Sequence, residues 1–176
     1  MHSINWPSGF VPGFTDNYVS NEIIVADLTA AEIWDSLDDT SLWPDYYSNV
    51  SEIRFHDGTG PKLGLGARFR FTTFGFPVEA EVTEYHHPSH GSPARIAWHG
   101  WVVGDADHAL DVHHAWLFED LPNNRVRVLT QETQNGKPAS ELRNTLPNPM
   151  LNAHQEWIEG LVKNARSRAQ AKVQGR

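Results

Sequence analysis

Six short segments with alternating apolar and polar residues dominate the middle of the chain. An alternation of period two is typical of half-buried β-strands, and Gly, Pro, Asn or Asp residues mark the turns between these segments. No segment of helical periodicity separates them, which predicts an antiparallel meander rather than a parallel sheet with crossover helices. The β-branched run EIIVAD at 22–27 adds a seventh strand. The alternating segments are 50–56, 67–74, 77–86, 94–103, 112–119 and 125–134.

Helical patterns lie before and after these segments in the sequence. Thr29 and Glu32 have the spacing of a capping box, which predicts a short helix, and a second short helix or turn follows around Pro44. Towards the C-terminus, Asn148 is a good N-cap and Pro149 fits the first helical position. Apolar residues then recur every three or four positions, which predicts one amphipathic helix of about 20 residues.

The first part of the chain differs from the rest in composition. It is rich in Gly, Pro, Ser and Asn, with the aromatic residues Trp6, Phe10 and Phe14 spaced through it. We expect an irregular N-terminal arm over 1–20 and a single domain over 21–172. Because burying a large apolar side chain contributes about 1.5–3 kcal/mol, the arm should pack across the sheet or a cavity mouth through its three aromatic residues.

Charge and residue content exclude several classes of protein. The chain has 14 Lys and Arg against 22 Asp and Glu, a formal net charge of −8. Nucleic acid is therefore not an expected partner, because phosphate contacts need a basic surface. No apolar stretch is long enough to span a membrane, and the first residues lack a secretory-signal pattern. We expect a cytoplasmic monomer or homodimer that has no membrane partner.

Motifs for metals and cofactors are missing from the sequence. The chain has no cysteine, which excludes disulfides, Cys-based zinc sites and thiol nucleophiles. In the pairs His113–His114 and His86–His87, neighbouring strand residues point to opposite faces, so neither pair can easily hold one ion. No Walker loop, GxGxxG, GxSxG or HExxH pattern occurs. We therefore expect neither a metal site nor a cofactor.

The alternation also assigns the two faces of the predicted sheet. In 67–74 and 77–86 the charged side chains gather on one face, while apolar residues such as Phe71 share the other. The apolar face of a half-buried strand packs into the core. The same phase in the last two strands places His114 and Glu132 inward, among apolar neighbours.

The order of one strand, two short helices, six strands and a long helix resembles the START-like superfamily, also called SRPBCC or Bet v 1-like. Within it, the chain is similar to the polyketide cyclase/dehydrase group. The resemblance implies an α+β helix-grip fold, in which a seven-stranded curved antiparallel sheet wraps around a long C-terminal helix. It covers residues 20–170 and rests on 21–47, 95–101, 113–136 and 148–166.

The resemblance also implies an apolar cavity between sheet and helix, and the inward phase supplies candidate residues for it. We predict that His114 and Glu132 are an acid–base pair, because they lie on strands that adjoin in a meander. The alternatives are a half-buried structural histidine and a solvated glutamate. His154 interrupts an apolar helix face, as a rim residue bonded to the sheet or as a ligand contact. The predicted ligand contacts are Tyr47, Phe71, Trp98, Trp116, Phe118, Thr130, His154, Trp157 and Ile158.

The implied ligand is a small apolar or aromatic metabolite of lipid, polyketide or aromatic type. Three classes of function stay open, because a fold does not determine an activity. An enzyme would perform cyclase, dehydratase or hydrolase chemistry in the cavity without a cofactor. A carrier would bind the ligand without turnover. An interaction module, similar to the co-chaperone members of the superfamily, would have a filled cavity and an exposed apolar patch.

Overall fold

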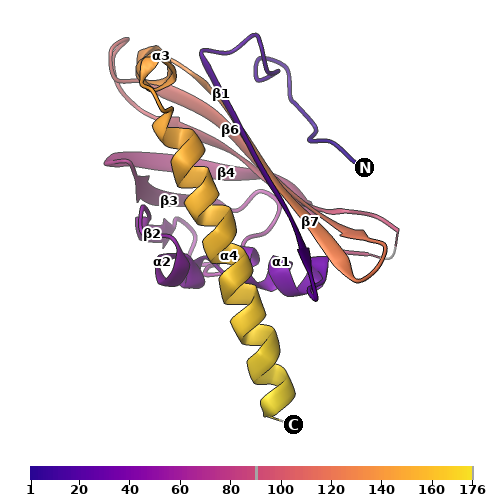
Figure 1. Ribbon diagram of the computed structural model, residues 1–176. Helices are drawn as coiled ribbons and strands as arrows, with labels where there is room; N and C mark the ends of the chain where they lie inside the picture. The colour runs from indigo at the N-terminus through magenta and orange to yellow at the C-terminus, as the bar shows by residue number, and fades with distance from the viewer. Residues whose placement is uncertain (90, 176) are drawn as a thin grey trace.

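A seven-stranded antiparallel sheet curves around the C-terminal helix in the computed structural model, which describes residues 1–89 and 91–175 (Figure 1). The strand order is β1-β7-β6-β5-β4-β3-β2, so consecutive strands pair from β2 to β7, and β1 pairs with β7. The predicted meander and fold class are confirmed. The strands are β1 Asn17–Ala26, β2 Ser51–Phe55, β3 Arg68–Thr73, β4 Phe76–His86, β5 Ala94–Val102, β6 Leu110–Leu121 and β7 Arg125–Asn135.

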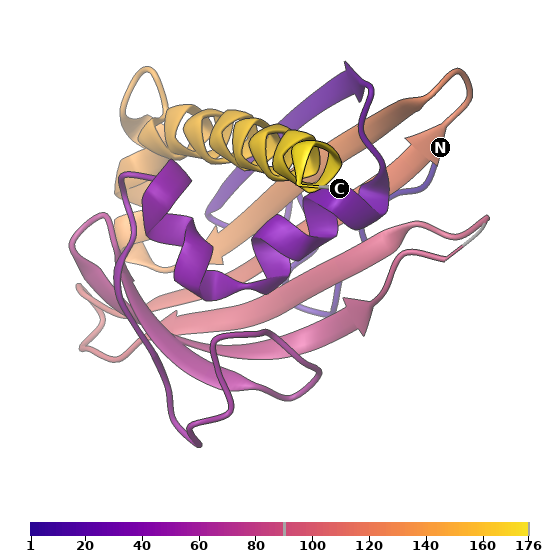
Figure 2. The same cartoon turned by 90° about the horizontal axis from the view of Figure 1, so that it is seen from below.

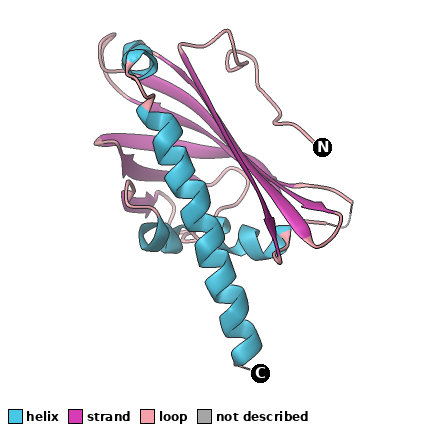
Figure 3. Cartoon of the chain, viewed as in Figure 1, coloured by secondary structure: helices cyan, strands magenta, loops and turns pink. Residues whose placement is uncertain are grey.

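Helices cover only the concave face of this sheet (Figures 2 and 3). The Thr29–Glu32 capping box forms as predicted, and Asn148 caps the last helix by accepting a hydrogen bond from the Met150 backbone N–H. No helix among the described residues is long and apolar enough to cross a membrane. The helices are α1 Ala30–Asp38, a 3-10 turn Thr40–Leu42, α2 Trp43–Tyr46, α3 Lys137–Asn144 and α4 Pro149–Gln174.

The extents of two elements and the presence of one helix differ from the sequence-based expectation. Strand β1 begins at Asn17 rather than at 22, so the irregular part of the N-terminal arm is shorter than predicted. Helix α3 was not predicted, because its sequence KPASELRN is largely polar and buries only Pro138 and Ala139. Helix α4 has 26 residues, more than the ~20 that its apolar periodicity indicated.

Helix α4 crosses the concave face close to the short helices. At Gly160 the helix approaches α2 so closely that a Cβ atom would collide with the carbonyl oxygen of Tyr46. One turn earlier, Trp157 enters the aromatic core beneath the helix, where it contacts Trp43 and Trp98. The packing of α4 on α2 and on the sheet therefore fixes the position of every α4 side chain that faces the interior.

The N-terminal arm lies on the outer face of the sheet, away from α4. Ile4, which is 5 % exposed, packs with Leu117 and Leu129, two residues that alternate with the inward ones. Trp6 contacts the ring of His113, and so does Phe10. The middle strands are consequently buried on both faces. The prediction that the arm packs on the sheet is confirmed for Trp6 and Phe10. It is wrong for Phe14, which is 87 % exposed.

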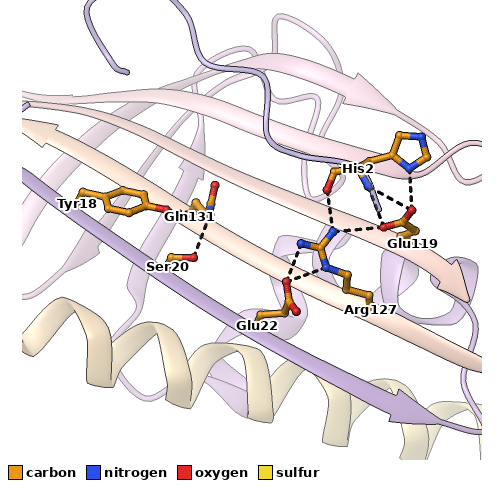
Figure 4. Close-up of polar contacts among 7 residues, drawn as sticks. All are labelled: His2, Tyr18, Ser20, Glu22, Glu119, Arg127 and Gln131. Carbon is orange, nitrogen blue, oxygen red and sulfur yellow. Dashed lines mark hydrogen bonds and ion pairs between the residues drawn. The ribbon is translucent and has the colours of Figure 1, made fainter. Parts of the chain in front are cut away.

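Polar contacts fasten the first residues of the arm to the outer face (Figure 4). Arg127 donates hydrogen bonds to Glu22, to Glu119 and to the backbone carbonyl of His2, at 2.7, 3.2 and 2.8 Å. The His2 backbone N–H and imidazole lie within hydrogen-bond distance of Glu119 as well. Arg127 is 8 % exposed, and its contacts with His2, Glu22 and Glu119 order the start of the arm.

Removing residues 2–8 should lower the free energy of unfolding by about 2–4 kcal/mol, because it exposes the apolar surface between the arm and Leu117 and Leu129. Urea denaturation followed by far-ultraviolet circular dichroism measures this change. Phe14→Ala is the control, and it should change stability by less than ~0.5 kcal/mol because its side chain lies in solvent. Equal stability of the truncated and full-length chains would contradict a structural role for the arm.

Candidate functional site

A pocket opens between the concave face of the sheet and the first half of α4. The turn between β3 and β4 and helix α3 contribute to its rim. Its open volume is about 40 Å³, room for a few water molecules or a small organic group. A larger ligand requires its walls to move. The lining residues are mostly apolar or aromatic: Tyr47, Phe71, Thr73, Phe74, Phe76, Val78, Trp98, Leu110, Val112, His114, Glu132, Gln134, Leu142, Met150, His154 and Trp157.

Tryptophan side chains fill most of the space that the sheet and α4 enclose. Trp43, Trp98 and Trp116 are at most 1 % exposed, and all three contact Trp157. The ring of Tyr47 stacks on Trp157 with centroids 4.3 Å apart. The pocket is therefore what remains at one end of a packed aromatic core, rather than a wide cavity along the whole helix.

Two histidines and one glutamate meet at this pocket. His114 on β6 and Glu132 on β7 are direct cross-strand partners, and His114 Nδ1 lies 3.1 Å from Glu132 Oε2. Helix α4 places His154 Nε2 3.2 Å from the same oxygen. The two imidazole rings are parallel, with centroids 4.5 Å apart. All three residues are at most 5 % exposed, so the predicted pairing of His114 with Glu132 exists and His154 joins it.

Further polar side chains form hydrogen bonds with Glu132 and His114. Gln134 donates a hydrogen bond to Glu132 Oε1 at 2.5 Å and accepts one from Asn17 at 2.8 Å. The Thr130 hydroxyl lies 2.8 Å from His114 Nε2. Gln134 and Asn17 were not among the predicted site residues. The alternation of β7 places Gln134 in phase with Glu132, two residues away, whereas Asn17 lies before the predicted start of its strand.

Burial sets the protonation of two groups in the site. It lowers the pKa of the His114 imidazole well below the ordinary histidine value, and the neighbouring His154 and His113 lower it further. It also raises the pKa of the Tyr47 hydroxyl to about 12. At neutral pH His114 is therefore uncharged and Tyr47 keeps its proton. The pocket lining thus contains a neutral imidazole and a hydroxyl donor.

The cluster contains the donor types of a metal site, because its three ligand atoms lie within 4.8 Å of one another. However, the nitrogens of His114 and His154 both face the same Glu132 oxygen at hydrogen-bond distance. A metal ion needs nitrogens about 2.0–2.1 Å away, with lone pairs that converge in the ring planes. Parallel rings do not converge in this way. The geometry therefore fits shared protons better than a bound metal.

The predicted site residues fall into two groups. Seven of them line the pocket, namely His114, Glu132, Tyr47, Phe71, Trp98, His154 and Trp157. Four lie outside the lining. Thr130 and Trp116 contact His114 from the sheet, whereas Phe118 and Ile158 are fully buried in the core. The rim residue of α3 was not predicted because that helix is largely polar, and those of the turn between β3 and β4 were not predicted because turn positions carry no periodicity.

The chain was compared with protein-family models, curated proteins and solved structures. No protein-family model and no curated protein matches the sequence. The crystal structure of hypothetical protein jhp0584 from Helicobacter pylori is similar, with a TM-score of 0.90 and 46% identity over 94% of this chain and 97% of that one. Two more distant structures share the fold alone. They are Ara h 8.0201, at TM-score 0.56 and 13% identity over 86% and 99% of the two chains, and the di-domain ARO/CYC StfQ, at 0.63 and 12% over 88% and 53%.

The sheet order, the position of α4 and these similarities identify the fold. The chain has the helix-grip fold of the START-like proteins, also called SRPBCC or Bet v 1-like.

Proposed function

We propose that the protein binds a small apolar or aromatic metabolite in the pocket and transfers protons on it through His114 and Glu132. The observation that carries this proposal is the buried cluster of His114, Glu132 and His154 at the side of an otherwise apolar pocket. Buried ionisable groups that face a pocket are characteristic of acid–base sites. His154 and Thr130 act as positioning residues for the pair.

The chemistry that this arrangement supports is proton removal and return without a cofactor. Glu132 can accept a proton from a bound molecule and share it with neutral His114, whose Nδ1 lies 3.1 Å away, while the Thr130 hydroxyl occupies the other ring nitrogen. Tyr47 can donate a hydrogen bond to an oxygen of the ligand, because its hydroxyl stays protonated. Cyclisation, dehydration and hydrolysis all include such steps. A cyclase, dehydratase or hydrolase similar to the polyketide cyclase/dehydrase group is therefore the proposed class.

The two other classes make different predictions. A carrier uses the same pocket without turnover, and substitution of His114 or Glu132 then changes only affinity. An interaction module is favoured by the filled aromatic core, but it also needs a continuous apolar patch. The most exposed large apolar residues are distributed over the arm, several loops and the end of α4: Met1, Phe14, Leu65, Val103, Leu146 and Val173. This distribution supports ligand binding over docking of a partner.

Native mass spectrometry of the protein purified from its own host tests the binding proposal. We expect an additional small-molecule mass on the wild-type protein. Leu142→Trp, at the half-buried pocket rim, should remove it, because the larger side chain closes the opening. Leu151→Trp is the matched control on the exposed side of α4 and should retain it. A chain that carries no small molecule but co-purifies with a protein would favour the interaction module.

A further inference from the structure

One amide nitrogen and two imidazole nitrogens contact the buried carboxylate of Glu132. The Gln134 amide donates to one carboxylate oxygen, and the imidazoles of His114 and His154 face the other. Gln134 offers only its amide N–H, because its oxygen accepts from Asn17, and His154 carries its proton on Nε2, because an N–H at Nδ1 would have no acceptor. The geometry therefore matches an ionised carboxylate that is 5 % exposed to water.

A chain of amides supports this carboxylate from the start of α4. The Met150 backbone N–H donates to Asn148, Asn148 donates to Asn17, and Asn17 donates to Gln134, at 3.0, 2.9 and 2.8 Å. Gln134 then donates to Glu132. Every bond points the same way, so each one polarises the next, and the chain begins at the positive end of a helix dipole. Glu132 is held as an anion by neutral groups.

No protein cation compensates this buried charge among the described residues. Glu132 is the only Asp, Glu, Lys or Arg of the pocket lining, and its ion-pair contacts are the two histidines. His114 is uncharged at neutral pH, because burial lowers its pKa. His154 Nδ1 is buried without a hydrogen-bond partner, so a doubly protonated ring there would bury an N–H that has no acceptor. The site thus carries an uncompensated negative charge, which is costly in an apolar surrounding.

We infer that the ligand of this pocket is a small organic cation, a protonated amine on an apolar or aromatic body. This inference rests on the proposed binding function and specifies its ligand class. The ammonium group supplies the charge that Glu132 lacks. The aromatic side chains of Tyr47, Trp98 and Trp157 in the lining stabilise a cation further through their ring electrons. A carboxylate ligand of the same shape is repelled by Glu132.

Three molecules of one shape test the inference: benzylamine, benzyl alcohol and benzoate, titrated calorimetrically at pH 7 in about 0.15 M salt to screen long-range attraction. We expect the protonated amine to bind at least ~10-fold more tightly than the alcohol, and benzoate to bind weakest. Glu132→Gln should abolish the preference for the amine and leave alcohol binding within about threefold. Glu156→Gln, which removes an exposed carboxylate on α4, controls for non-specific attraction and should keep the preference.

The outcomes separate this inference from the proposed function. Alcohol binding as tight as amine binding overturns the cation inference and leaves pocket binding intact. An imidazolium at His114 or His154 in histidine ¹⁵N spectra also overturns it, because the cluster would then compensate its own charge. The isobutyl series of amine, alcohol and acid repeats the test if the aromatic ring does not enter. If no compound binds, the ligand retained in native mass spectrometry tests the inference: a protonated amine supports it, and a neutral or anionic molecule overturns it. Absence of any ligand contradicts both proposals.

Discussion

Trp157→Ala should lower the free energy of unfolding by about 3–5 kcal/mol, the largest stability loss that we expect from a single side chain. Trp157 is 2 % exposed and lies where α4, α2 and the concave face of the sheet meet. Its ring contacts Tyr47 at 4.3 Å and Trp43 at 5.2 Å between centroids, and Trp98 and Trp116 from the sheet. Alanine leaves a cavity that these rigid rings cannot collapse to fill.

Trp101→Ala is the matched control for this substitution. Trp101 lies on β5 on the opposite face from Trp98, is only partly buried and has Arg68 over its ring. We expect a loss of less than about 1.5 kcal/mol, because little buried surface is removed. Urea denaturation by circular dichroism measures both variants independently of tryptophan emission. Equal losses of unfolding free energy in the two variants would mean that the aromatic core is not the main contact that stabilises α4 on the sheet.

Much of the fold follows from the period-two pattern. On β3, the charged residues Arg68 and Arg70 are exposed while Phe69 and Phe71 are buried, as their alternation predicts. The inward phase extends to His114 and Glu132 in the same way. The pattern does not indicate that another segment of the chain covers the outer face of the sheet. Leu117 alternates with inward residues, yet the arm buries it, and neither composition nor periodicity indicates where an irregular segment will lie.

The missed parts of the site are polar residues at the ends of elements. Asn17 begins β1 in the segment NYVSN, where Asn, a residue depleted in strands, occurs twice, and its side chain is needed for the hydrogen bond to Gln134. Asn148 was predicted as a helix cap, and its second contact, to Asn17, depends on how β1 and α4 pack. The small size of the pocket is likewise a packing result, since four tryptophans occupy the space that their sequence positions alone left open.

Glu132→Gln and His114→Ala should each reduce kcat by about 10²–10⁴-fold on the ligand identified from the host. Glutamine keeps the shape of the side chain but cannot carry the negative charge or accept a proton. Alanine removes the imidazole that faces Glu132 at 3.1 Å. Single-turnover rates separate this loss from weaker binding, and a denaturation curve for each variant shows whether the chain is still folded.

His113→Ala is the matched control for His114→Ala. His113 is adjacent to His114 in sequence and 3 % exposed, but its ring lies on the outer face against Trp6 and Phe10. We expect turnover close to that of the wild type, with reduced stability. Suppose instead that all three variants keep near-normal turnover while Trp98→Ala abolishes binding. The cluster would then be a structural and ligand-orienting element. A carrier would follow only if no other ionisable group of the pocket, including Tyr47 and His154, proved essential.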